Sequence, residues 1–216
     1  MKLYKYLSDE TFKEHLESHL RGEVYLSIWR DFNDPMEGFF TYISRRENQG
    51  VIQEIIGEKY YYRVCCFCRS YKKFLLWSYY TNKHRGVCLE YDVDKTNLPP
   101  GCTIKPVNYT KTLPFFNPAG NIQDQAQTFL LTKLNVWKQE SEVRLLGHDL
   151  PQNTVRIGKL TGIIFGVNFV VSDPDDELRQ RVRRTILNGC YPPKLYNAVI
   201  ESNIPTISRQ IINRND

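Results

Sequence analysis

The sequence has no hydrophobic run that approaches a membrane-spanning helix, which needs about 20 apolar residues. Its opening does not resemble a signal peptide either, because Met1–Leu7 is followed directly by Ser8, Asp9 and Glu10. Secreted and membrane-spanning classes of protein are therefore not expected. We predict a cytoplasmic protein without a membrane partner.

Several signatures of known chemistry are also missing. The sequence contains no G-x-G-x-x-G, no G-x-x-x-x-G-K-[ST] and no G-x-S-x-G, which argues against the common dinucleotide, P-loop and α/β-hydrolase sites. His15 and His19 lie four residues apart, but no acidic pattern of the metalloprotease kind surrounds them. A solvated helix face explains this spacing better than a metal site.

Cysteine is present but does not form a zinc pattern. A structural zinc site usually has two C-x-x-C pairs, and the sequence does not contain two. We expect all six cysteines (Cys65, Cys66, Cys68, Cys88, Cys102 and Cys190) to be reduced, with the first three packed as small hydrophobic side chains. A nucleophilic pair of Cys68 or Cys88 with His84 stays open.

The composition is that of a globular protein, with 41% hydrophobic and 25% charged residues among 216. One ordinary hydrophobic core fits this length, and we expect a single domain over residues 1–216. The net charge of +5 is mildly basic. It favours contact with a nucleotide or nucleic acid without establishing either.

Hydrophobic periodicity predicts an α+β fold with a central, mostly antiparallel sheet and flanking helices. Expected strands are Lys2–Tyr6, Glu23–Ile28, Lys59–Cys68, Gly86–Asp92, Thr103–Tyr109, Thr154–Gly158, Thr161–Gly166, Leu195–Glu201 and Thr206–Ile211. Expected helices follow Ser8 and cover Ser44–Ile56, Lys73–Lys83, Ile122–Trp137 and Pro174–Leu187. Asn33, Asp34 and Pro35 predict a turn.

The segment W-K-Q-E-S-E-V-R-L-L at Trp137–Leu146 predicts a further strand with charge on one face. Side chains alternate in a strand, so Glu140, Glu142 and Arg144 share a face opposite Val143 and Leu145. This charged face is either solvated or the floor of a polar site.

Five motifs occur in the order found in one bacterial family. They are Y-K-Y near the start, F-N-D-P at Phe32–Pro35, C-F-C-R at Cys66–Arg69, L-W-S-Y-Y followed by H-R-G, and W-x-x-E-x-E-x-R at Trp137–Arg144. Together they make the chain resemble the family catalogued as domain of unknown function 2971, over about three-quarters of its length. That family is in turn distantly similar to ADP-ribosyltransferases.

The resemblance implies an ADP-ribosyltransferase-like fold and activity with NAD as substrate, in a toxin or anti-phage effector that has an antitoxin partner. Glu142 would stabilise the oxocarbenium-like transition state and hold a ribose hydroxyl, while Glu140 would orient or deprotonate a protein, nucleic-acid or water acceptor. Residues implied to bind NAD are Lys5, Tyr6, Ser27, Trp77, Tyr80, His84 and Arg144.

Two other classes of function stay open. One is a non-catalytic nucleic-acid-binding module that uses Arg179, Arg181, Arg183, Arg184, Lys72 and Lys73. The other is a nuclease whose carboxylates hold Mg²⁺. It needs more acidic residues near Glu140 and Glu142 than the sequence places there.

Overall fold

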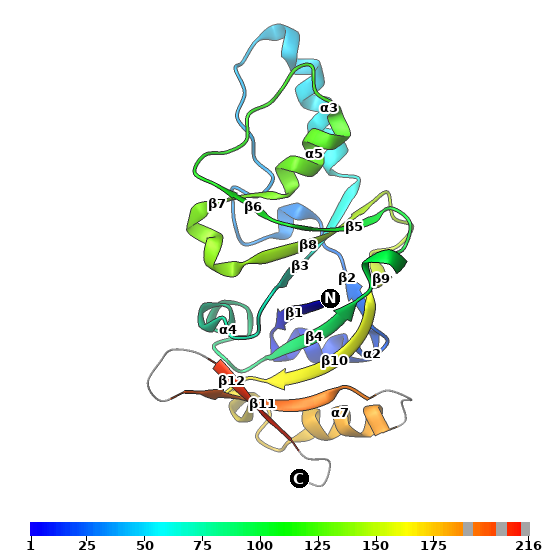
Figure 1. Ribbon diagram of the computed structural model, residues 1–216, viewed down its shortest axis with the longest axis vertical. Coiled ribbons are helices and arrows are strands. Elements are labelled where there is room, and N and C mark those ends of the chain that lie inside the picture. The colour runs from blue at the N-terminus through cyan, green and yellow to red at the C-terminus, as the bar shows by residue number, and fades with distance from the viewer. Residues whose placement is uncertain (188–191, 202–206, 213–216) are drawn as a thin grey trace. The chain divides into compact units, whose positions relative to one another are not determined.

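The computed structural model describes residues 1–187, 192–201 and 207–212. It divides into two compact units, each assembled from separate stretches of chain (Figure 1). Unit 1 contains Met1–Val24, Phe67–Asn97 and the described residues of Arg156–Asp216, and unit 2 contains Tyr25–Cys66 and Leu98–Val155. The single domain stays a prediction, and the two units are described one at a time.

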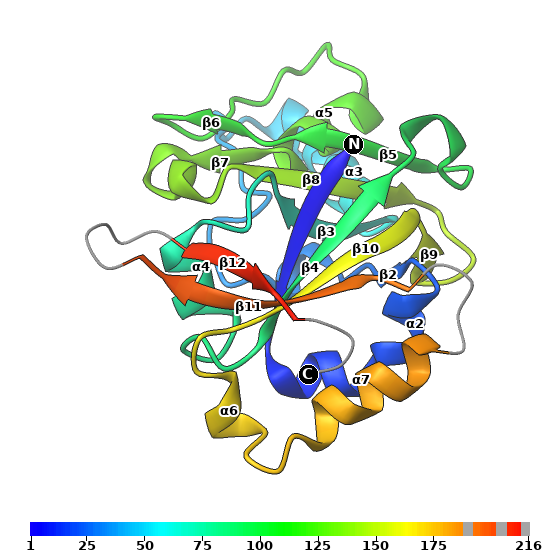
Figure 2. The same ribbon diagram turned by 60° about the horizontal axis from the view of Figure 1, so that its bottom comes forward.

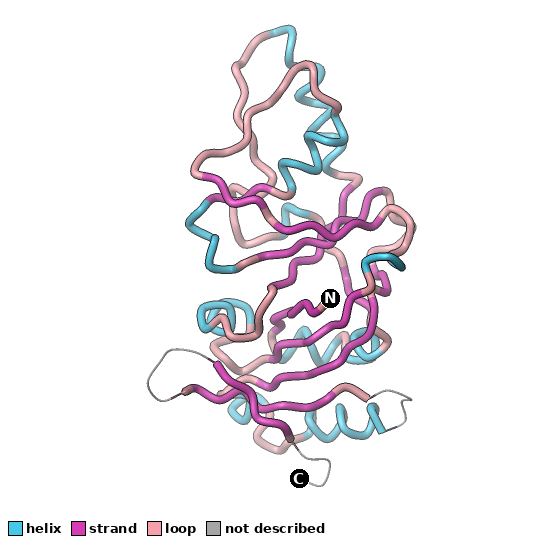
Figure 3. Tube along the Cα trace, viewed as in Figure 1, coloured by secondary structure: helices cyan, strands magenta, loops and turns pink. Residues whose placement is uncertain are grey.

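Unit 1 is built on strands whose order is β12-β11-β10-β4-β1, with the end of β3 beside β1. Their bounds are β1 Lys2–Leu7, β3 Tyr62–Cys68, β4 Val87–Val93, β10 Gly158–Phe165, β11 Lys194–Ile200 and β12 Ile207–Ile211. The β10–β11 pair is parallel, and the pairs β1–β4, β4–β10 and β11–β12 are antiparallel. The mixed α and β fold with a mostly antiparallel sheet is therefore confirmed (Figure 3).

The helices of unit 1 are α1 Asp9–Glu14, α2 Leu16–Leu20, α4 Phe74–Tyr80, η3 Lys95–Asn97, α6 Phe169–Ser172 and α7 Glu177–Leu187. Ser8 caps α1 as expected, because its side chain accepts a hydrogen bond from the Thr11 amide. Helix α4 packs on the sheet face of Tyr4 and Tyr6. Helix α2 packs on the other face, where His19 hydrogen-bonds Tyr91, and α7 lies beside it (Figure 2).

In unit 2 the strands β3, β8 and β5 are neighbours in that order, and β6 pairs with β7 in parallel. Their bounds are β5 Cys102–Pro106, β6 Asn108–Thr110, β7 Thr132–Leu134 and β8 Glu142–His148. The short strands β2 Glu23–Tyr25 and β9 Thr154–Arg156, which each have residues in both units, form a further pair. Helical segments are η1 Trp29–Asp31, η2 Arg46–Asn48, α3 Gln49–Lys59, α5 Ile122–Leu130 and η4 Asn135–Glu140.

Helices α3 and α5 pack against each other and cover one face of the strands of unit 2. Phe129 and Leu130 of α5 share a core cluster with Tyr62 and Val64 of β3 and with Leu146 of β8. Because side chains alternate along a strand, Glu142 and Arg144 point to the same face as Leu146. The charged residues of β8 therefore lie on the side that α5 covers.

Two of the elements predicted next to the charged residues of β8 are wrong. The helix expected over Ile122–Trp137 ends at Leu130, because Thr132–Leu134 pairs with β6 instead of continuing the helix. The strand expected from Trp137 begins only at Glu142, because Asn135–Glu140 forms a 3₁₀-helix and Ser141 adopts a left-handed conformation at its end (φ 49°, ψ 47°). Tertiary pairing here overrides local periodicity.

Several other boundaries move. The strand expected over Glu23–Ile28 ends at Tyr25, and the helix expected from Ser44 begins at Gln49, after a short 3₁₀ turn. The predicted start of the last strand at Thr206 lies outside the described residues, as does Cys190. The other five cysteines, all of which are described, are not in disulfide bonds. No helix in the described ranges is long and apolar enough to cross a membrane.

Two glycines, one just after a helix and one inside a helix, differ in the space that a side chain would find. Gly22, just after α2, has φ +77°, and a Cβ there would lie 2.0 Å from the carbonyl oxygen of Gly158. A Cβ at Gly57, inside α3, would meet no atom outside its own helix within 4 Å. Gly22→Ala should destabilise the protein by about 2 kcal/mol or more, whereas Gly57→Ala should stabilise it by about 0.5–1 kcal/mol.

Urea unfolding of both variants checks this pair. Equal stabilities would mean that the close approach of Gly22 to Gly158 does not constrain the fold.

Candidate active site

The strand β8 starts with a carboxylate residue whose backbone is held in place by a neighbouring strand. The left-handed turn at Ser141 redirects the chain from η4 into β8, and the amide of Glu142 donates a hydrogen bond of 2.9 Å to the Tyr109 hydroxyl of β6. Glu142 is only 6% exposed. A solvated strand face is therefore the wrong interpretation of this segment.

Arg144 lies at the centre of the site and is completely buried. Its Nε donates to Glu142 at 2.7 Å, and its Nη2 donates to Glu142 at 3.2 Å and to Glu37 at 2.9 Å. Its Nη1 donates to Glu37 and, at 2.5 Å, to the carbonyl oxygen of Leu130 at the end of α5. One guanidinium thus holds two carboxylates and a helix terminus, as its planar fork allows.

Lys133 on β7 is a second buried cation in this cluster. Its ammonium group lies 2.6 Å from Glu140 and 3.2 Å from Glu142, over the ring of Trp137. Glu140 and Glu142 do come together as predicted, but Lys133 bridges them and they do not share a strand face. The structural reason is that Glu140 belongs to η4 and Glu142 to β8.

The cations keep Glu142 ionised. Burial opposes its charge, but the charge and hydrogen bonds of Arg144, with the charge of Lys133, lower the pKa of Glu142 to about 2. The thiol of Cys66 on β3 also hydrogen-bonds Glu142. Burial and then the Glu142 charge raise the pKa of Cys66 well above its ordinary value, so this cysteine is a neutral donor and not a thiolate nucleophile.

Glu37 and Lys133 are residues of this site that the sequence pattern did not reveal; Glu37 comes from a loop. It follows the predicted turn at Asn33–Pro35, which forms, with the Asp34 side chain accepting from the Met36 amide at 2.9 Å. The turn carries Glu37 to the buried face of Arg144. The available signal was the acidic residue in F-N-D-P-M-E-G, two positions after the F-N-D-P motif.

Three of the residues predicted to bind NAD gather on one sheet face of unit 1. The rings of Tyr6 and Trp77 meet edge to face at 5.4 Å, and His84 stacks on Trp77 at 6.2 Å. His84 Nε2 lies 3.0 Å from the Ser78 hydroxyl, and burial lowers the pKa of His84. Tyr80, on the same helix as Trp77, packs at the edge of this cluster.

Lys5 and Ser27 lie elsewhere. Lys5 points to the opposite face of β1 from Tyr6 and lies over the ring of Phe67 at 5.7 Å. Ser27 belongs to unit 2 and forms a backbone bridge with Val64. Within unit 1, therefore, Lys5 does not join the group of Tyr6, Trp77 and His84.

A further buried carboxylate, Glu90 on β4 of unit 1, was not predicted. Lys2, Arg209 and the Thr161 hydroxyl contact it at 2.6, 2.6 and 2.9 Å. Burial opposes its charge, but these hydrogen bonds lower the pKa of Glu90 to about 2. It anchors strands β1, β10 and β12 to β4.

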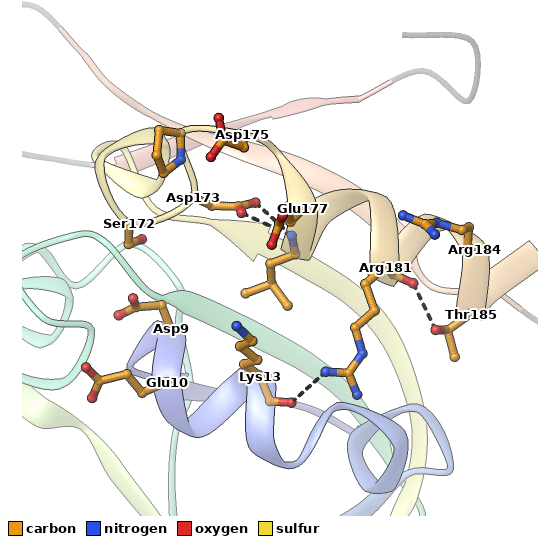
Figure 4. A pocket seen from close by; sticks show the side chains of 12 residues that line it. Asp9, Glu10, Lys13, Ser172, Asp173, Asp175, Glu177, Arg181, Arg184 and Thr185 are labelled. Carbon is orange, nitrogen blue, oxygen red and sulfur yellow. Dashed lines mark hydrogen bonds between the residues drawn. The ribbon is translucent and has the colours of Figure 1, made fainter.

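A polar pocket of about 710 Å³ lies between α1 and α7 in unit 1 (Figure 4). It includes Arg181 and Arg184 of the predicted nucleic-acid surface and no residue of the predicted NAD site. Arg181 pairs with Glu17 at 2.6 Å, and Arg179 packs over the rings of Phe165 and Phe169. At least two of the four arginines are thus engaged within the fold.

Comparisons of the chain with protein-family models, curated proteins and solved structures give no match. Over the residues that the structure describes, no group of three or more His, Cys, Asp or Glu side chains is arranged to hold a metal ion. The geometry around Glu142 is therefore the structural basis for a proposed function.

The central position of Arg144 predicts a large loss of stability on its removal. Arg144→Met leaves Glu37 and Glu142 buried beside each other without their shared cation, which should cost about 3–5 kcal/mol. Arg21→Met removes an exposed guanidinium that pairs with Glu23 at 2.9 Å, and stability should barely change. Urea unfolding of the two variants measures the difference. Similar losses in both would show that Arg144 does not organise the fold.

Glu142 should also make stability depend on pH. Its pKa is lowered on folding, so its contribution is complete above the ordinary value of 4.5 and is lost as the pH falls towards about 2. Glu142→Gln should remove this part of the acid sensitivity. Unfolding free energies of both proteins across this window give the difference, and parallel curves would contradict the lowered pKa.

Proposed function

We propose that the chain is an ADP-ribosyltransferase-like enzyme that cleaves the bond between nicotinamide and ribose in NAD, with Glu142 as its central carboxylate. The observation that carries this proposal is a buried glutamate kept ionised by two cations. The E-x-E of Glu140, Ser141 and Glu142, inside the motif W-x-x-E-x-E-x-R, is the part that resembles those enzymes.

The chemistry needs a fixed negative charge of this kind. As the nicotinamide leaves, positive charge develops on the ribose, and a carboxylate already held in place stabilises it without reorganisation. Because Glu142 is removed from water, its field acts in a surrounding of low dielectric constant. Arg144 fixes the orientation of the carboxylate through two of its nitrogens.

Lys133 is the contact that a substrate would replace in this proposal. It lies farther from Glu142, at 3.2 Å, than from Glu140, at 2.6 Å. A ribose hydroxyl that donates to Glu142 would leave Lys133 paired with Glu140, so no buried charge loses its partner. Glu140 would then orient or deprotonate the acceptor, which is water, a protein or a nucleic acid. The residues of unit 1 that the resemblance assigns to NAD stay predictions.

The test is nicotinamide release from NAD by purified protein, with water, protein and nucleic acid offered as acceptors. Glu142→Gln removes the charge and should lower the rate by a factor of about 10² or more. Glu142→Asp keeps the charge but withdraws it by one methylene, and should lose about 10²-fold. Glu54→Gln, at an exposed position of α3, is the matched control and should retain full activity.

Far-UV and near-UV circular dichroism of each variant separate a lost rate from a lost fold. Wild-type protein that releases no nicotinamide with any acceptor would overturn the proposal. Folded Glu142→Gln protein with undiminished activity would remove Glu142 from the mechanism and leave the cluster a structural one.

A further inference from the structure

Glu37 and Glu142 share one guanidinium. Glu37 takes the outer edge of Arg144 through Nη1 and Nη2, and Glu142 takes the side of Nε and Nη2. Both residues are almost completely buried, at 4% and 6% exposure. When two carboxyl groups lie this close to each other, the negative charge on one raises the pKa of the other.

The surroundings of the two carboxylates are unequal. Glu142 has a second cation, Lys133, at 3.2 Å and a hydrogen bond from the Cys66 thiol. Among the residues that the structure describes, Arg144 is the one cation within ion-pair distance of Glu37. The one cation that pairs with Glu37 is therefore also paired with Glu142.

We propose that Glu37 is the acid of this cluster that binds and releases a proton, while Glu142 keeps its charge. In this arrangement Glu37 alternates between a neutral carboxyl group and a carboxylate without leaving Arg144. Glu142 stays the fixed negative group.

The balance of interactions at Glu37 agrees with this division. Burial raises the pKa of Glu37, and the attraction of Arg144 does not offset it. The charged groups that face it are Arg144 and Glu142 from β8 and Lys133 from β7, and of these Glu142 raises the pKa while the two cations lower it. Environments that push the pKa values of two neighbouring carboxyl groups apart are typical of acid and base partners.

The consequence for activity rests on the proposed function. When Glu37 is neutral, Arg144 directs its whole charge to Glu142, and when Glu37 is ionised the two share it. Glu37 is then a positioning residue that acts through Arg144. It should shift the pH profile of nicotinamide release and leave the contact of Glu142 with substrate intact.

The direct test does not need any activity. Protein labelled with ¹³C at the glutamate side-chain carboxyl carbons is titrated by NMR, and Glu37→Gln, Glu142→Gln and Glu54→Gln assign three resonances. The signal lost in Glu37→Gln should titrate above the ordinary value of 4.5, and the signal lost in Glu142→Gln should not titrate above about 2. The Glu54 signal provides an exposed reference.

A stability measurement tests the same inference if the ¹³C resonances of the carboxyl groups cannot be resolved. Glutamine matches the neutral form of Glu37, so below pH 4.5, where Glu37 carries its proton, Glu37→Gln should unfold within about 3 °C of wild type, while Glu142→Gln should lose considerably more. Because the pKa of Glu37 is raised on folding, its contribution falls as the pH rises, and Glu37→Gln should lack that fall.

A Glu37 resonance that titrates at or below 4.5 would overturn the inference. So would equal destabilisation by Glu37→Gln and Glu142→Gln. Neither result would bear on nicotinamide release by wild-type protein, so failure here is distinguishable from failure of the proposed function. If the enzyme is active, an unchanged pH profile in Glu37→Gln would restrict Glu37 to a structural role.

Discussion

The guanidinium of Arg144 is the interaction on which unit 2 depends. It joins the start of β8 to the loop that contains Glu37 and to the end of α5 at Leu130. Leu130 lies 14 residues from Arg144 and Glu37 lies 107 residues from it, and a planar group with five donors can bind all of these segments at once. The path of the chain between Glu37 and Arg144 is thus fixed at a buried point, and Glu142 acquires its orientation from the same side chain.

The cluster is costly to form. Each buried ion loses several kcal/mol of hydration, and the attraction between the partners returns this only where the hydrogen bonds are nearly complete. Arg144 meets that condition, since all three of its nitrogens have partners. Glu142 meets it through Arg144, Lys133 and Cys66. Burial raises the pKa of Glu142, and the charges and hydrogen bonds of Arg144, Lys133 and Cys66 outweigh burial and make the pKa low.

The sequence predicted the elements well where one signal dominated. Alternating Tyr, Val and Cys residues located β3, and Ser8 located the start of α1. It failed around Lys133, where three residues leave the helical pattern to pair with β6, a partner that is distant in sequence and cannot be seen in local periodicity. It grouped Glu140 with Glu142 but for the wrong reason, because only the structure shows the left-handed Ser141 between them. Glu37 could not be placed at all, since a turn residue carries no periodicity.

The energetics of the cluster distinguish a site from a scaffold. Apolar side chains of similar volume usually stabilise a core as well as a buried ion pair does, or better. A cluster of Glu37, Lys133, Glu140, Glu142 and Arg144 is therefore a poor solution if stability is the only requirement. Under the proposals above, it would provide what an apolar core cannot, a negative group of fixed position beside an acid that can change its charge. Under the proposed function, the fixed carboxylate would stabilise the positive charge that develops on ribose, and the neighbouring acid would adjust that field through Arg144.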